Sequence, residues 1–170
     1  MAATILAILI TLLPVQAKPE IRAADLERKV YTLVNEQRRA HNLPTIASDS
    51  GLADVARAHS ADMVRRGFFD HVNPDGRDPR RRVETAGHPC RAVVSENIYE
   101  AIQYSRIVIT NGQKAYDWKT LDQIASEIVD GWMASAGHRA NILGTGYATT
   151  GVGIAVSSND EVYATQVFCG

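Results

Sequence analysis

The segment from Thr120 to Gly137 carries the pattern that most narrows the possible folds of this chain. Its apolar residues recur at steps of three and four, which predicts a helix with one face buried in a core. Those residues are Leu121, Ile124, Ala125, Ile128, Val129 and Trp132. Thr120 and Gln123 have the spacing of a capping box, so the helix begins there, and Gly137 is expected to end it.

The rest of the chain alternates between helical and strand patterns. Helices are expected over residues 23–41 and 51–66, where apolar residues again repeat at helical steps. Strand patterns bounded by turn residues cover 92–95, 106–110, 113–118, 152–156 and 161–168. Asn111-Gly112 is typical of a two-residue hairpin turn. Helices at both ends of a mostly antiparallel set of strands predict an α+β fold.

The N-terminus carries an apolar run over residues 5–15, which is too short for a membrane span of about 20 residues. Val15 and Ala17 stand at the −3 and −1 positions of a cleavage site, so residues 1–17 are expected to be a signal peptide. No Lys or Arg precedes the run, which keeps a buried N-terminal helix as the alternative. Residues 23–170 are then expected to form a single domain, secreted or periplasmic, with no transmembrane anchor left after cleavage.

The overall charge balance does not point to a polyanionic partner. Lys and Arg total 18 against 19 Asp and Glu, a formal net charge of −1. This balance gives no electrostatic reason to expect nucleic acid or an anionic membrane, and the aromatic content of 6% weakens any base-stacking surface. We expect a small ligand or an extracellular macromolecule as partner, and a monomer by default.

Cys90 and Cys169 make an even count of cysteines. In an exported chain such a pair is expected to form a disulfide, which would tie the middle of the chain to its end. Two free, buried thiols are the alternative. No spacing of Cys and His indicates a structural zinc site.

Three histidines are candidates for chemistry. His59 lies on the apolar stripe of its helix, which is also the place of a hydrogen-bonded core histidine; His71 follows a helix end; and His138 follows Gly137. His41 and His88 are expected at the surface. No HExxH, P-loop or GxGxxG motif is present, and the segment around Ser135 lacks the first Gly of a nucleophile elbow. The charged run over residues 77–82 is expected to be a solvated surface segment.

Several motifs occur in a characteristic order. They are Phe69-Asp70-His71, Ser95-Glu96-Asn97-Ile98, the segment from Trp132 to Leu143, Gly151-Val152-Gly153-Ile154-Ala155 and Thr165-Gln166-Val167-Phe168. Over residues 26–168 the chain resembles the CAP superfamily (cysteine-rich secretory proteins, antigen 5 and pathogenesis-related 1), specifically its bacterial SCP-domain branch. The resemblance implies an α-β-α sandwich, in which a central, mostly antiparallel sheet lies between helices and a cleft opens on one side.

In animal and plant members that cleft holds two His and two Glu, often with zinc between the histidines. By the resemblance, His71 and His138 match the two histidines and Glu96 matches one glutamate. The other glutamate position falls on Ser135. His59 matches a histidine typical of bacterial members, and we count it with the same cleft.

The resemblance therefore implies a ligand cleft of His59, His71, Glu96, Ser135 and His138. Zn²⁺ or another divalent cation would be bound by His71 and His138, with His59 or Glu96 as a further ligand. A hydrogen-bonded polar cluster without metal is the alternative. Asn97 is expected to tie neighbouring loops, and Arg139 with Asn141 to brace the turn after the helix.

The leading hypothesis for function is a secreted, non-enzymatic CAP module that binds a divalent cation, a small ligand or a macromolecule. One rival is a metal-dependent, protease-like hydrolase that uses metal-bound water near His71 and His138, with Glu96 as the candidate catalytic base. Another is a lipid or sterol carrier. The absence of an evident nucleophile–base pair favours binding over catalysis.

Overall fold

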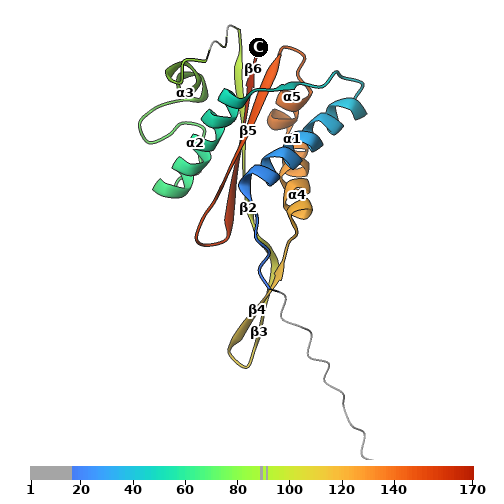
Figure 1. Ribbon diagram of the computed structural model, residues 1–170, viewed down its shortest axis with the longest axis vertical. Helices are drawn as coiled ribbons and strands as arrows, with labels where there is room; N and C mark the ends of the chain where they lie inside the picture. The colour runs from blue at the N-terminus through green and yellow to red at the C-terminus, as the bar shows by residue number, and fades with distance from the viewer. Residues whose placement is uncertain (1–16, 89, 91) are drawn as a thin grey trace, which may run out of the picture.

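The computed structural model describes residues 17–88, 90 and 92–170. All but the last residue of the expected signal peptide lie outside this range. The elements form three layers, with a sheet between two groups of helices (Figure 1). α2 (Ser50–Arg66) and α3 (Pro79–Thr85) lie on one side of the sheet, and α1 (Ala23–Ala40), α4 (Leu121–Ala134) and α5 (Ala136–Leu143) lie on the other. The predicted α+β class and α-β-α sandwich are confirmed.

The central sheet has the strand order β1-β5-β6-β2 within the described residues. β5 (Thr149–Val156), β6 (Glu161–Cys169) and β2 (Val94–Ile102) are antiparallel neighbours, whereas β1 (Ala47–Ser48) pairs in parallel with β5. The prediction was wrong about the extent of β2, which spans nine residues instead of residues 92–95. Its central residues Glu96 and Asn97 are polar yet buried, so the strand shows no alternation that a sequence pattern can reveal.

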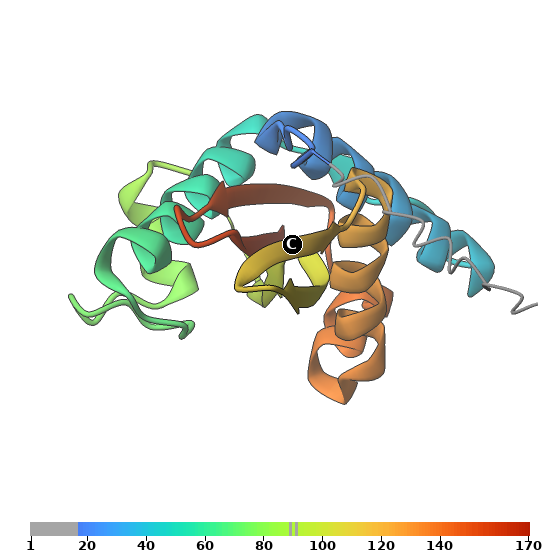
Figure 2. The same cartoon turned by 90° about the horizontal axis from the view of Figure 1, so that it is seen from below.

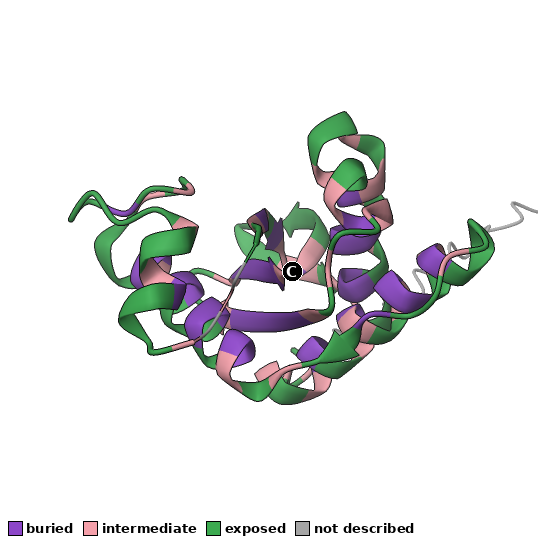
Figure 3. Ribbon diagram, turned by 90° about the horizontal axis from the view of Figure 1, so that it is seen from above, coloured by how far each residue is buried: buried purple, intermediate pink, exposed green. Residues whose placement is uncertain are grey.

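The two faces of the sheet are covered by different helices. Along β6, Val162, Ala164 and Phe168 belong to the core shared with α1 and α4. Val167, on the opposite face, packs with residues of α2. Figure 3 shows the buried residues of the helices facing the sheet. This alternation along a strand buried on both faces is what a three-layer sandwich requires.

α2 lies unusually close to β5 because β5 has glycines at the contact. A Cβ atom added to Gly151 would come within 2.1 Å of the backbone nitrogen of Ala53. One added to Gly153 would come within 2.0 Å of the backbone nitrogen of Arg57. The two glycines therefore set the distance between helix and sheet, and so the position of every α2 side chain, His59 included.

Gly153→Ala is expected to lower the free energy of unfolding by about 1–3 kcal/mol, because the new methyl group forces α2 away from the sheet. Urea denaturation followed by circular dichroism measures this change. Gly137→Ala is the matched control: a Cβ atom there meets nothing within 4 Å, and the substitution is expected to be neutral or slightly stabilising. Equal stabilities of the two variants would contradict the close contact.

The helix predicted to run to Gly137 ends earlier. α4 ends at Ala134, and Ser135 has an extended backbone with a ψ angle of 125°. The chain then begins α5, so that α4 and α5 follow each other along the same side of the molecule (Figure 2). The apolar repeat had already ended at Trp132, whose indole donates a hydrogen bond to the carbonyl of Ile98 over 3.0 Å. His138 therefore lies in the first turn of a new helix.

Most of the segment over residues 77–82 is exposed, as predicted, but from Pro79 onward it also forms a helix, α3, which the sequence analysis did not predict. Asp78 caps the helix by accepting a hydrogen bond from the backbone N–H of Arg81, and Pro79 occupies the first turn. Aspartate before proline is a common way to start a helix. The helix buries Val83 against α2 and turns Arg82 inward, while Arg81 stays exposed.

The remaining elements agree with the predictions. β3 (Tyr104–Thr110) and β4 (Gln113–Trp118) form a separate two-stranded hairpin that projects from the sandwich (Figure 1). Asn111 and Gly112 both have positive φ angles, 51° and 76°, as a two-residue hairpin turn demands. Cys90 and Cys169 form the expected disulfide, which joins the segment after α3 to the end of β6. No helix in the described part of the chain is both long and apolar enough to cross a membrane.

Candidate functional site

Glu96 lies at the centre of a cluster formed by β2, α2, α3 and the loop between the two helices. Its side chain is 1% exposed. One carboxylate oxygen, Oε2, accepts a hydrogen bond from the guanidinium of Arg82 over 2.5 Å. The other, Oε1, accepts one from Nδ1 of His71 over 2.9 Å. A buried carboxylate is tolerated only with such partners, and here both oxygens are engaged.

Arg82 is the site residue that the sequence analysis missed. Its side chain is 9% exposed, and beyond Glu96 it donates hydrogen bonds to the carbonyls of His71 and Arg77, over 2.8 and 2.9 Å. It therefore fixes both the carboxylate and the loop that carries His71. The helix-start signal Asp78-Pro79 could have revealed that this charged run is a helix with an inner face.

His71 is the exposed member of the cluster. Its side chain is 44% exposed, and Nδ1 is used for the hydrogen bond to Glu96, which leaves Nε2 outside that bond. The hydrogen bond to Glu96 raises the pKa of His71, even though partial burial acts in the opposite direction. The carboxylate therefore fixes which ring nitrogen bears the proton and how the ring is oriented.

His138 belongs to α5, on the opposite side of the sheet from α2 and α3, yet its ring lies near that of His71. Its ring centroid lies 6.3 Å from that of His71, with the two rings edge-on to each other. Burial, followed by the neighbouring charge of His71, lowers the pKa of His138. The pair thus combines an imidazole that tends to be protonated with one that tends to be neutral.

His59 lies beneath this pair and has no exposed side-chain surface. Its Nε2 lies 3.0 Å from the carbonyl oxygen of Asp70 and 3.8 Å from Oε1 of Glu96. Burial lowers the pKa of His59, which favours the neutral ring with its proton on Nε2. His59 is therefore close to Glu96 but, unlike His71, does not reach solvent.

Two asparagines attach the start of α5 to β2. Asn97 donates a hydrogen bond to the carbonyl of His138 over 3.2 Å, and Asn141 donates one to Oδ1 of Asn97 over 2.9 Å. These contacts hold His138 beside the strand that carries Glu96. Ser135 caps α5 without a side-chain hydrogen bond, and in the described residues its hydroxyl has no hydrogen bond to the histidines.

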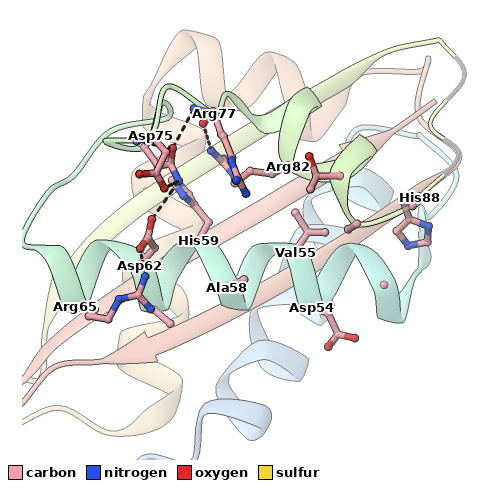
Figure 4. Close-up of a pocket in the computed structure, with 16 residues that line it drawn as sticks. Asp54, Val55, Ala58, His59, Asp62, Arg65, Asp75, Arg77, Arg82 and His88 are labelled. Atoms are coloured by element: carbon pink, nitrogen blue, oxygen red, sulfur yellow. Dashed lines mark hydrogen bonds and ion pairs between the residues drawn. The ribbon is translucent and has the colours of Figure 1, made fainter.

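A groove of about 820 Å³, lined by both charged and apolar residues, lies between α2 and α3 (Figure 4). His59 and Arg82 line it together with charged residues that include Asp62, Asp75 and Arg77. His71 and His138 are not among the lining residues. The groove and the histidine pair are therefore two separate surfaces, and the buried Glu96 cluster lies between them.

The donor set fits only a weak metal site. Nowhere in the described part of the chain do three or more His, Cys, Asp or Glu side chains come together in a way that could hold a metal ion. Glu96 is engaged by Arg82, and His59 is fully buried with Nε2 on the carbonyl of Asp70, so His71 and His138 are the better placed ligands. Two imidazoles completed by water suit a borderline cation such as Zn²⁺.

Comparisons with known proteins agree with this architecture. A family model described as the cysteine-rich secretory protein family (CAP) matches residues 31–168. The Bacillus subtilis (strain 168) protein YkwD is 32% identical over 144 residues, covering 85% of this chain and 47% of that protein. This chain thus spans about half the length of that relative.

Solved structures show the same fold. An extracellular protein with an SCP domain from Bacillus anthracis str. Ames has a TM-score of 0.64 at 27% identity, covering 86% of this chain and 41% of the other. An outer surface protein from Borrelia burgdorferi has a TM-score of 0.69 at 16% identity, covering 90% of this chain and 98% of the other. The second likeness concerns the fold alone.

Proposed function

This chain belongs to the cysteine-rich secretory protein (CAP) family, and from that premise we propose that it is a non-enzymatic binding module that takes a divalent cation of the zinc class between His71 and His138. The observation that carries the proposal is the placement of the two rings. Glu96 holds His71 through Nδ1, and His138 lies beside it with its centroid 6.3 Å away. A carboxylate that orients a ligating imidazole from behind is a recurrent feature of metal sites.

The state of Glu96 favours binding over hydrolysis. A general base must lie within hydrogen-bond reach of the proton that it removes, about 2.6–3.2 Å. Glu96 is 1% exposed, and its two oxygens already accept hydrogen bonds from Arg82 and His71. Its role in the proposal is to position His71.

We propose that the chain works outside the cytoplasm. Its disulfide requires an oxidising compartment to persist. The similar Bacillus anthracis and Borrelia burgdorferi proteins are described as extracellular and outer-surface proteins, respectively. A cation held by two imidazoles keeps open positions, which would let it bind an anionic group of a small ligand or a partner macromolecule.

Calorimetric titration with zinc tests the proposal. His71→Ala and His138→Ala are each expected to weaken zinc binding by at least about tenfold to a hundredfold, because each removes a ligand, and even the loss of a group that only supports a ligand costs that much. His41→Ala is the control: His41 is exposed at the end of α1, where its ring contacts the carbonyl of Gln37. Unchanged affinity in both site variants would rule out this site.

The same binding is expected to depend on pH. Zinc must displace a proton from His71, whose pKa is raised by Glu96, so affinity should fall as pH drops through a value above the usual 6.5 or so of histidine. Titrations between about pH 5 and 8 measure this profile. A profile that is flat across this range would show that the cation binds elsewhere.

A further inference from the structure

The hairpin of β3 and β4 has one apolar face. In its register Ile107 lies opposite Tyr116, Ile109 opposite Lys114, and Tyr104 opposite Trp118. Alternation along the strands puts Ile107, Ile109, Lys114, Tyr116 and Trp118 on one side, and a β-bulge between Tyr104 and Arg106 brings Tyr104 to the same side. The aromatic rings confirm it, since the centroids of Tyr104, Tyr116 and Trp118 lie 4.9–5.9 Å apart. We call these six residues the apolar hairpin face.

The outer part of this face, around Ile107 and Ile109, is open among the described residues. Ile107 is 40% exposed and Ile109 is 66% exposed. The hairpin forms a sheet of its own and extends away from the helices that cover the main sheet (Figure 1). An isolated two-stranded hairpin is only marginally stable in water, and an apolar face of this kind marks a contact surface.

We propose that the apolar hairpin face docks the protein onto an anionic lipid surface. Tyrosine and tryptophan favour the boundary between lipid headgroups and acyl chains, where isoleucines can be buried to a shallow depth. From residue 107 to residue 116 the only charged side chain is Lys114, which lies on this face beside Ile109. The outer half of the hairpin is therefore apolar and cationic, although the whole chain has a net charge of −1.

Lys18 lies at the inner end of the face, where its ammonium is 5.5 Å from the centroid of the Trp118 ring. The open part of the face is therefore its outer half, which carries Ile107 and Ile109.

A second copy of the chain fits this face less well. A specific protein–protein interface takes about 20–30 residues from each partner, whereas this face offers six. Two such faces packed together would also bring two Lys114 side chains into one apolar contact, without an acidic residue between positions 107 and 116 to pair with them. A lipid surface needs no matching shape and supplies the opposite charge.

Vesicle flotation tests the proposal. Residues 18–170, which include every helix and strand of the structure, are mixed with vesicles of phosphatidylcholine alone or with phosphatidylglycerol added. We expect binding to the anionic vesicles, weakened by salt and by Lys114→Gln. Replacing Ile107 and Ile109 together by Asn should reduce the partition coefficient by about tenfold or more. Binding should also shift the fluorescence of Trp118 to the blue, while the fully buried Trp132 stays unchanged.

Val108→Asn is the matched control, because Val108 is 41% exposed on the same strand but lies on the opposite face. It should change binding by less than about twofold. Circular dichroism confirms that the variants fold. The proposal is overturned if the protein does not bind anionic vesicles, or if Val108→Asn weakens binding as much as the paired isoleucine variant does. It is also overturned if sedimentation shows that the parent is a dimer and that only the paired isoleucine variant is a monomer.

Discussion

Replacing Arg82 with methionine is expected to lower the free energy of unfolding by about 3–5 kcal/mol at neutral pH. The substitution keeps the length and the apolar stem of the side chain but removes the cation from Oε2 of Glu96. A carboxylate that is 1% exposed would then stay buried with His71 as its remaining hydrogen-bond partner in the described cluster. Urea denaturation of the purified variant measures the loss.

Two further variants separate the ion pair from other effects of the substitution. Arg81→Met changes the neighbouring residue of α3, which is exposed, and should alter stability by less than about 0.5 kcal/mol. Combining Arg82→Met with Glu96→Gln removes the buried charge as well as its partner, so part of the lost stability should return. If Arg82→Met and Arg81→Met prove equally stable, the pair with Glu96 contributes nothing to the fold.

The second large effect is expected from the disulfide. Replacing Cys90 and Cys169 together by serine should lower the free energy of unfolding by about 2–5 kcal/mol. The bridge closes a loop with a sequence separation of 79 residues, so its loss frees a large part of the unfolded chain. It also holds the segment after α3, and with it the helix that carries Arg82, to the end of β6.

Denaturation of the paired serine variant is the direct measurement, with the oxidised parent as reference. Alkylation of the unfolded, unreduced parent provides the control, because a chain with its bridge intact takes up no label. A serine variant as stable as the parent would mean that packing alone holds this end of the sheet. Two labelled cysteines in the parent would mean that the bridge does not form in solution.

The elements that could be predicted are those whose signals are local. Thr120 and Gln123 form both hydrogen bonds of the predicted capping box, and Asp49 caps α2 as its position before the helix indicates. The hairpin turn at Asn111 follows from the preference of such turns for Asn-Gly. Each of these features depends on residues within one or two turns of chain, so neighbouring residues are sufficient to specify it.

The candidate site was predictable only in part. The resemblance to a family identified His71, Glu96 and His138 by their motifs, and the structure places all three side chains around one corner of β2. It did not indicate that Glu96 would be buried. Nor did it identify Arg82, because a run of four arginines in six residues is typical of a solvated surface.

By itself, the sequence determined the periodic helices and the hairpin, because those features follow from the spacing of neighbouring residues. Its resemblance to a family supplied the candidate site residues. Only the tertiary structure decided which charges meet. Arg82 and Glu96 lie on different elements, and their contact exists because α3 packs on α2 while β6 holds β2 along its full length. Because of that contact both oxygens of Glu96 accept hydrogen bonds, so the carboxylate orients His71 and is not free to act as a base. The protonation and the contacts of a buried carboxylate depend on the partners that packing brings to it.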